Sequence, residues 1–158
     1  MKFQIREATK NDYESVNELV VEVHNLHVES RPNNFKENDR PLNRRYYEEL
    51  LDDIRCKIFL VETQGKEIIA YTILRVIEIE SNSIVIQRKF VYMEELCAKE
   101  QYRGKGIGEL LFNKAVEYTK RIGVSSLELS VWEFNDPAIK FYESMGMKTR
   151  TRRMEIEV

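Results

Sequence analysis

Cysteine, histidine and proline are scarce in this chain of 158 residues, which holds two cysteines, two histidines and three prolines. Cys56 and Cys97 both lie in apolar stretches and form no Cys-x-x-Cys pair. A disulfide framework and a zinc ribbon are therefore not expected. His24 and His27 are three residues apart with no evident third ligand, a spacing unlike the His-Glu-x-x-His zinc helix. No metal site is predicted.

Long apolar runs and an excess of one charge are also absent. No apolar segment approaches the roughly 20 residues that a membrane helix needs, and residues 1–10 lack the apolar core of a signal peptide. The formal net charge is -2, whereas nucleic-acid-binding domains are usually strongly basic. We therefore expect a cytoplasmic protein that binds neither membranes nor nucleic acids. The cations between Lys148 and Arg153 are expected to form a solvated strand face.

The composition favours one packed domain over residues 1–158. Hydrophobic residues make up 42% and charged residues 33% of the chain, a balance typical of a globular protein with a solvated surface. The length fits one domain and leaves little room for a second.

The hydrophobic pattern predicts the order β-α-α-β-β-β-α-β-α-β. Alternation or short apolar runs indicate strands over 2–7, 57–63, 67–79, 91–98, 127–131 and 148–158. Helical spacing indicates helices over 11–27, from about 41, after the glycine-rich segment 104–108, and between 135 and 146. Consecutive strands favour antiparallel pairing, and the later β-α-β units require parallel neighbours. The fold class expected is α/β (α+β mixed), a mixed, mostly antiparallel sheet flanked by about four helices.

A glycine-rich loop between a predicted strand and a predicted helix is the strongest local motif. Gly104, Gly106 and Gly108 alternate with Lys105 and Ile107 directly after Arg103. Glycines allow a backbone to approach a ligand closely, and the following helix presents unpaired N–H groups, which together favour phosphate binding. The spacing is neither a P-loop nor a good dinucleotide fingerprint. A simple tight turn is the alternative interpretation.

Two blocks of sequence resemble the GNAT superfamily of N-acetyltransferases. Residues 103–108 match its R/Q-x-x-G-x-G/A signature within the stretch EELCAKEQYRGKGIGELL, and residues 135–147, NDPAIKFYESMGM, resemble its N-x-x-A-x-x-x-Y-x-x-x-G-F segment. Met147 replaces the usual Phe. The order of elements agrees as well, so the resemblance implies a GNAT-like fold with acetyl-CoA as cosubstrate.

The resemblance assigns cofactor-binding roles along both blocks. The backbone of Leu96 and Ala98 would pair with the pantetheine arm, which inserts like an added strand. The N–H groups of the loop would cradle the pyrophosphate; its residues are Arg103, Gly104, Lys105, Gly106, Ile107 and Gly108. Asn135 matches a pantetheine contact, and as a good N-cap residue it can equally begin the last helix.

Tyr142 and Glu94 are the implied catalytic residues. Tyr142 matches the family's general acid, which protonates the leaving thiolate, and its structural alternative is a core aromatic beside Phe141. A base must accept a proton from the amine, and Glu94 is favoured over Glu95 for this role or for amine binding. Strand alternation predicts Glu94 on one face with Tyr92, Leu96 and Ala98. A solvated or salt-bridged carboxylate is the alternative.

The acceptor amine is expected beside the end of the first helix and the loop after it. In the family this region borders the acceptor site, so His24, His27, Arg31 and Phe35 are candidates for substrate choice. Glu95 and Trp132 join them, with Trp132 as a core residue or a pocket wall. Surface or packing roles are the alternative for both histidines. Cys97 is predicted to pack rather than to act as a nucleophile.

The function predicted is transfer of an acetyl group from acetyl-CoA to a primary amine of a small molecule or a peptide. The alternatives are transfer of a longer acyl group, a non-catalytic acyl-CoA sensor, and a nucleotide-binding module. The last leaves the Asn135/Tyr142 block without a purpose. A homodimer is an open expectation.

Overall fold

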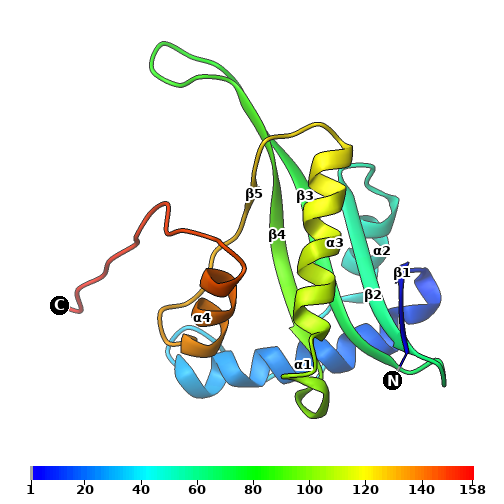
Figure 1. Ribbon diagram of the computed structural model, residues 1–158. Coiled ribbons are helices and arrows are strands. Elements are labelled where there is room, and N and C mark those ends of the chain that lie inside the picture. Colours follow the sequence, from blue (N-terminus) through cyan, green and yellow to red (C-terminus); the bar gives the residue numbers. More distant parts are fainter. Residues whose placement is uncertain (1) are drawn as a thin grey trace.

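A five-stranded sheet forms the centre of the molecule in the computed structural model, which describes residues 2–158. Its strands lie in the order β1 (Phe3–Glu7), β2 (Cys56–Thr63), β3 (Ile68–Ile79), β4 (Arg88–Ala98) and β5 (Leu127–Glu128) (Figure 1). The first four are antiparallel to their neighbours, and β5 is parallel to β4. The described helices are α1 (Tyr13–Ser30), α2 (Arg44–Asp52), α3 (Ile107–Arg121) and α4 (Asp136–Ser144), with short 3₁₀ helices at Lys10–Asp12 and Glu100–Tyr102. The mixed, mostly antiparallel sheet with flanking helices is as predicted.

Helices cover both faces of the sheet. On one face α1 and α2 bury a core that includes Val16, Leu19 and Tyr47. On the other face α3 buries a second core around Leu111, Phe112 and Ala115. The sequences of β2 and β3 are near-continuous apolar runs, because both faces of these strands are covered.

Capping residues fix where the helices begin. Thr9 and Asp12 form a capping box at the short 3₁₀ helix that leads into α1, a pattern visible in the sequence as a Thr three residues before an Asp. The Asn43 side chain accepts a hydrogen bond of 3.1 Å from the Tyr46 N–H, so α2 begins at Arg44 rather than near Pro41.

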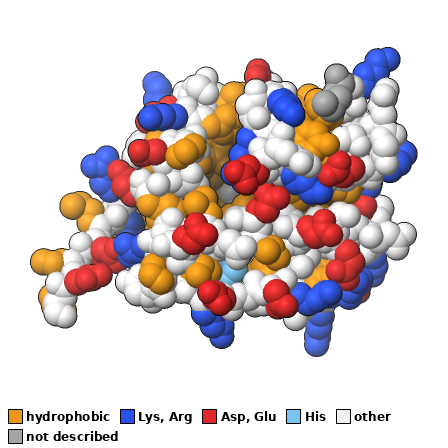
Figure 2. Space-filling view, turned by 90° about the horizontal axis from the view of Figure 1, so that it is seen from below, with side chains coloured by type: hydrophobic (Ala, Val, Ile, Leu, Met, Phe, Trp, Pro, Cys, Tyr) orange, Lys and Arg blue, Asp and Glu red, His pale blue; other side chains and the backbone are white. Residues whose placement is uncertain are grey.

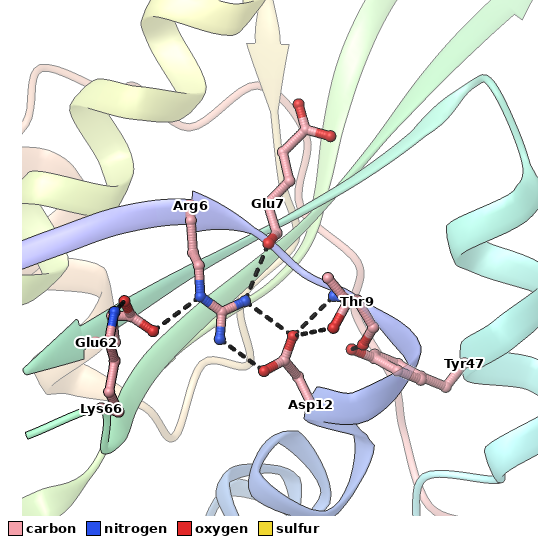
Figure 3. Close-up of polar contacts among 7 residues, drawn as sticks. All are labelled: Arg6, Glu7, Thr9, Asp12, Tyr47, Glu62 and Lys66. Carbon is pink, nitrogen blue, oxygen red and sulfur yellow. Dashed lines mark hydrogen bonds and ion pairs between the residues drawn. The ribbon is translucent and has the colours of Figure 1, made fainter.

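A polar network ties β1 to its neighbours beside α1 (Figure 3). The Arg6 guanidinium donates to both Asp12 oxygens, at 2.7 and 2.9 Å, and to Glu62 at 2.8 Å. Asp12 also accepts from the Thr9 N–H and hydroxyl, and the Tyr47 hydroxyl donates to the Thr9 carbonyl at 2.8 Å. Arg6 holds the pKa of Asp12 below its usual value, chiefly through these hydrogen bonds. The two buried carboxylates are thus satisfied by charge-assisted hydrogen bonds.

A β-bulge interrupts β4. Ile73 of β3 lies opposite Glu95 and the next residue, Leu74, lies opposite Met93, so Glu94 has no partner of its own. One extra residue reverses the alternation of side chains and backbone groups beyond it. Leu96 and Ala98 pack toward α3, whereas Glu94 binds Arg75, which lies opposite Tyr92. The prediction that Glu94 shares a face with Leu96 and Ala98 is therefore wrong.

The C-terminal part of the chain departs most from the predicted elements. The strand expected over 127–131 pairs only at Leu127–Glu128, because the chain diverges from β4 beyond that point. The strand expected over 148–158 is not formed, and all of these residues are exposed. The tail leaves the body after α4 and projects away from the sheet (Figure 1), so its backbone has no neighbouring strand within the described chain.

Candidate active site

The central feature of the candidate site is an opening between β4 and β5. The two strands pair only at Val91–Leu127 and Tyr92–Glu128, and they spread apart toward α1 and α4 (Figure 1). Viewed from below, the surface is hollowed, with hydrophobic side chains on the walls of the hollow (Figure 2). The opening exposes the edge of β4 from Met93 to Ala98 to a ligand.

The backbone of β4 is turned so that it can bind across this opening. The Val91 N–H donates toward β5, to the Ser126 carbonyl at 3.0 Å, whereas the Lys99 N–H donates toward β3, to the Ile69 carbonyl at 2.9 Å. Successive backbone N–H groups along a strand point to opposite sides. Since the Lys99 N–H points toward β3, the N–H groups of Leu96 and Ala98 point toward the opening. The bulge at Glu94 produces this change of direction.

The glycine-rich loop follows β4 at the same end of the sheet. Gly104 and Gly106 have φ values of 72° and 79°, a left-handed conformation that side chains other than glycine rarely adopt. From Gly104 to Gly108 no backbone N–H has a hydrogen-bond partner within residues 2–158. These N–H donors lie at the positive end of the α3 helix dipole, because α3 begins at Ile107. The loop therefore has the donors and the dipole that an anion requires.

Cations and packing hold this loop in place. The Arg103 side chain donates to the Ala98 carbonyl at 3.1 Å and lies 3.5 Å from Glu22. Lys105 lies over the Tyr102 ring at 5.2 Å. A Cβ at Gly108 would lie 3.3 Å from the Phe141 ring, a tight contact, so glycine also favours the close approach of α4. The role of Phe141 beneath the loop was not evident from the sequence.

Tyr142 lies on α4 with its ring against the α3 face of the sheet. It packs against the same core as Leu96 and Ala98, with its ring centroid 6.4 Å from that of Phe112. Burial raises the pKa of Tyr142 to about 12, and the neighbouring Cys97 thiol adds to the effect. Its hydroxyl has no hydrogen-bond partner among the described residues. The phenol is thus kept protonated and free to donate.

Asn135 begins α4 as an N-cap. Its side chain accepts a hydrogen bond of 3.3 Å from the Ala138 N–H, and its carbonyl accepts from the Ile139 N–H at 3.0 Å. The capping role considered for Asn135 is therefore present. The side-chain NH₂ group keeps its donors, so the cap does not prevent a ligand contact.

The bulge places Glu94 and Glu95 in different environments. Glu94 is held by Arg75, which also lies 3.5 Å from Asp53. Glu95 accepts a hydrogen bond from the Tyr71 hydroxyl, and it keeps access to solvent. Burial raises the pKa of Glu95 above its usual value, the Glu94 charge raises it further, and the Tyr71 hydrogen bond opposes both. Because Glu95 is exposed to solvent, its carboxylate can exchange protons with water.

Four of the residues expected at the acceptor site meet in one aromatic cluster. The ring of Phe35 lies 5.1 Å from that of His27, 6.4 Å from that of His24 and 5.7 Å from that of Trp132. We name this the acceptor cluster; it also contains Phe134, which stacks on Trp132 at 5.8 Å. Burial lowers the pKa of His27, and His24 Nε2 lies 2.8 Å from the Lys36 carbonyl.

Phe134 and Arg31 also lie at the acceptor cluster, and only Arg31 was predicted from the sequence. Phe134 was missed, although its spacing of two from Trp132 is that of residues sharing a strand face. Arg31 was a candidate, and its guanidinium lies 5.4 Å from the Trp132 ring centroid. It also forms an ion pair with Glu155 of the tail.

Cys97 is a packing residue, as predicted. It is 4% exposed, and its Sγ lies 3.6 Å from the Leu19 carbonyl. Burial raises the pKa of the Cys97 thiol to about 12, so it is not a thiolate at neutral pH.

Residues 2–158 contain neither a metal cluster nor a membrane-spanning helix. No group of three or more His, Cys, Asp or Glu side chains in that part of the chain is arranged to hold a metal ion. None of its helices combines the length and apolarity needed to span a bilayer.

Known proteins match both the sequence and the fold. A crystal structure of a mutant protein from Bacillus halodurans superposes with a TM-score of 0.96 and 35% identity, covering 98% of this chain and 99% of that one. An uncharacterized N-acetyltransferase of Methanocaldococcus jannaschii is 27% identical over 94% of this chain, which spans 62% of that relative's length. Thialysine N-epsilon-acetyltransferase of Bos taurus is 34% identical over 61 residues, 39% of this chain and 36% of that protein.

A family model covers most of the chain and includes both sequence blocks. The model of the acetyltransferase (GNAT) family matches residues 20–147, which contain β4, the glycine-rich loop and α4. The opening in the sheet, the loop and the tyrosine on α4 all lie within this match. The chain therefore belongs to the acetyltransferase (GNAT) family, a family of acyltransferase enzymes.

Proposed function

We propose that residues 1–158 form one N-acetyltransferase domain that transfers an acetyl group from acetyl-CoA to a primary amine. The observation that carries the proposal is the free edge of β4, which leads directly to the glycine-rich loop and faces Tyr142. A nucleotide-binding module would need the loop and would leave the opening in the sheet without a role. We also propose a cytoplasmic location, with neither nucleic acid nor membrane as a partner.

The residues present fit the pantetheine arm and the diphosphate of acetyl-CoA. The outward N–H groups of Leu96 and Ala98 match the amide groups of a pantetheine arm, which can add to the strand edge. The unpartnered N–H groups from Gly104 to Gly108, with Arg103 and Lys105 beside them, match a diphosphate. The NH₂ group of Asn135 is a further donor at the start of α4.

Tyr142 would supply the proton that the leaving sulfur requires. When bound, acetyl-CoA supplies an acetyl thioester open to attack by a neutral amine. The raised pKa of Tyr142 keeps the phenol protonated at neutral pH, and the hydroxyl has no competing acceptor among the described residues. A positioned phenol of this kind is suited to general acid catalysis.

Glu95 is the better supported base of the two carboxylates. An ammonium group with a pKa of about 10.4 must lose a proton before it attacks. The raised pKa of Glu95 makes it a stronger proton acceptor than an ordinary carboxylate. Glu94, which the sequence favoured, is engaged by Arg75, and we propose that its charge raises the basicity of Glu95.

The acceptor cluster would bind the amine substrate. Its aromatic faces can contact an alkyl chain or a cation, and Arg31 beside Trp132 can bind a carboxylate. The thialysine acetyltransferase of Bos taurus is named for a small amino acid with a primary amine. We propose amino acids with side-chain amines as the first acceptors to test. Acyl groups longer than acetyl should be tested alongside, since the hollow is lined by apolar side chains.

The test is release of free coenzyme A with acetyl-CoA and a panel of amines. The panel should hold thialysine, lysine, ornithine, a polyamine, an aminoglycoside and a short peptide with a free N-terminus. We expect turnover with at least one class of amine. Tyr142→Phe should lower kcat by about 10²-fold or more, since general acids contribute on this scale, while calorimetry should show unchanged affinity for coenzyme A.

Tyr47→Phe is the matched control. Its hydroxyl donates to the Thr9 carbonyl far from the opening, so its loss should reduce the free energy of unfolding by about 1 kcal/mol and leave kcat unchanged. Binding of coenzyme A without turnover of any amine would reject the proposal in favour of an acyl-CoA sensor.

A further inference from the structure

Two consecutive residues of β3, Tyr71 and Thr72, hold Glu95 at two different points. The Tyr71 hydroxyl donates a hydrogen bond to the Glu95 carboxylate. The Thr72 hydroxyl donates to the Glu95 backbone carbonyl at 2.7 Å. Both β3 side chains are completely buried, so close packing leaves them little freedom to move. The side chain and the backbone of Glu95 are therefore held by separate groups that are themselves fixed.

The two hydroxyls approach Glu95 from opposite faces of the sheet. Tyr71 belongs to the core beneath α1 and α2, as does Cys97, which lies opposite it on β4. Thr72 lies opposite Leu96, which packs toward α3, and directly opposed residues of a ladder point to the same face. Glu95 is therefore bonded to one core residue on each side of β3.

Glu95 needs these bonds because it occupies the least supported part of β4. Glu94, directly before it, is the extra residue of the bulge and has no partner of its own on β3, and a bulge disrupts the ladder around it. On the other edge of β4 the ladder with β5 has already ended at Tyr92. The hydroxyls of Tyr71 and Thr72 thus supply a constraint that backbone pairing provides elsewhere in the sheet.

The Tyr71 hydroxyl also acts on the charge of Glu95. A donor to a carboxylate stabilises the ionised form, the form that can accept a proton. Burial and the Glu94 charge oppose this and raise the pKa of Glu95. Tyr71 keeps its own proton, because burial and the Glu95 charge raise its pKa well above the ordinary value.

The surroundings of Glu95 contain further groups that can affect its titration. The titratable groups that face Glu95, or the side chains in contact with it, come from four elements: Glu22 of α1, Tyr46 of α2, Tyr71 and Arg75 of β3, and Glu94 and Cys97 of β4. Arg75 forms an ion pair with Glu94, and the Cys97 thiol is kept neutral by burial. Tyr71 is the group that donates a hydrogen bond to the carboxylate itself.

We propose that Tyr71 and Thr72 are positioning residues for Glu95, with Tyr71 orienting the carboxylate in its charged form and Thr72 fixing the bulged backbone that carries it. This inference rests on the proposed function, in which Glu95 accepts a proton from the amine. A purely structural role for the two hydroxyls would affect stability alone. Their removal must therefore be followed through the behaviour of Glu95.

Tyr71→Phe tests the first part through the pH profile of kcat/KM, measured with an amine that the wild type acetylates. Loss of the donor raises the pKa of Glu95 further, so the acidic limb should move to higher pH. On that limb kcat/KM should fall by about tenfold, the scale of a hydrogen bond to a charged group. In a Glu95→Gln background, Tyr71→Phe should cause no further decrease, because the group on which it acts is gone.

Tyr47→Phe is the matched control for this variant. Tyr47 is also completely buried beneath α1 and α2, but its hydroxyl donates to the Thr9 carbonyl and not to a carboxylate. Its acidic limb should coincide with that of the wild type. An acidic limb that moves equally in both variants, or in neither, would overturn the role of Tyr71.

Thr72→Val tests the second part, because valine keeps the shape of threonine and removes the hydroxyl. Without its bond to the Glu95 carbonyl the bulge can shift, and kcat should fall by about tenfold, since small misplacements of a catalytic group have large effects. Thr72→Ser retains a hydroxyl and should restore most of the rate. Equal kcat values for Thr72→Val and the wild type would overturn the role of Thr72.

A measurement without acetyl transfer separates this inference from the proposed function. Carbon-13 NMR titration of the Glu95 carboxyl group gives its pKa directly, and the pKa should be higher in Tyr71→Phe than in the wild type. An unchanged pKa would overturn the role of Tyr71 even in an active enzyme. Absence of turnover with every amine of the panel would overturn the proposed function, while the titration would still decide whether Tyr71 holds the Glu95 carboxylate.

Discussion

Polar groups near β1 are paired within the chain, whereas several polar groups at the opening beside β4 have no partner among residues 2–158. Around β1, Arg6 is bonded to both Asp12 and Glu62, and the remaining groups of that network also have partners (Figure 3). Beside β4, backbone N–H groups of the glycine-rich loop and the Tyr142 hydroxyl have no partner within residues 2–158. Stability is gained where polar groups are paired within the chain, and binding becomes available where they are left for a ligand.

The largest expected effect is on the β1 region. Arg6→Met removes the cation between two carboxylates whose side chains are 11% and 4% exposed. Because the buried Asp12 carboxylate then loses its cation, while Glu62 keeps its ion pair with Lys66, we expect a loss of about 3 kcal/mol in the free energy of unfolding. Urea denaturation followed by circular dichroism would measure it.

Arg45→Met is the control for this change. Arg45 pairs with Glu49 on the surface of α2, where both side chains are mostly exposed, so the loss should stay below about 0.5 kcal/mol. Equal losses in the two variants would show that the β1 network is no more important than a surface pair.

Glu95 is the proposed base, and its pKa is raised whereas that of Asp12 is lowered. Glu95→Gln removes the proposed base, and kcat should fall by about 10²-fold. In the wild type kcat/KM should decrease as the pH falls through the raised pKa of Glu95, and this acidic limb should be missing in the variant. A pH profile of both proteins measures this. An unchanged acidic limb in the Gln variant would assign the base to another group.

The same two carboxylates should affect stability with opposite signs. The pKa of Asp12 is lowered in the fold, so Asp12 contributes stability above its ordinary pKa, and that contribution is lost as the pH falls through the folded value. The pKa of Glu95 is raised, so its ionised form opposes folding at neutral pH. Asp12→Asn should therefore destabilise the protein at pH 7, and Glu95→Gln should stabilise it.

The smallest effect separates two glycines of similar conformation. Gly106 and Gly123 have φ values of 79° and 75°, and a Cβ at either would meet no atom within 4 Å. Alanine at each position should cost about 1–2 kcal/mol of stability through backbone strain alone. Gly106→Ala should in addition weaken coenzyme A binding in calorimetry. If Gly123→Ala weakened binding equally, the loop would have no special part in holding the diphosphate.

The sequence was sufficient for the elements and motifs that depend on local patterns. The capping box at Thr9 and Asp12, the helix after Gly106 and the cap at Asn135 all follow from spacing of a few residues. His27, Phe35 and Trp132 were each expected at the acceptor site, and the structure brings their rings together.

The features that were missed depend on pairing between distant segments. Alternation in β4 assumes an unbroken ladder, and only the register with β3 reveals that Glu94 is inserted. The apolar alternation from Met154 to Val158 is typical of a strand, but a strand also needs a neighbour, and the described chain supplies none, so the predicted strand is not formed. The bonding of Glu95 to Tyr71 likewise depends on that register.

The single extra residue in β4 also restricts which insertions and deletions this strand can tolerate. Substituting Glu94 alters one side chain, but deleting it would rotate every later position by half a period and point the amides of Leu96 and Ala98 back into the sheet. Such a deletion would leave the hydrophobic composition and length of the strand almost unchanged. The length of β4 between Val91 and Lys99 is therefore under a tighter constraint than the identity of the residues within it.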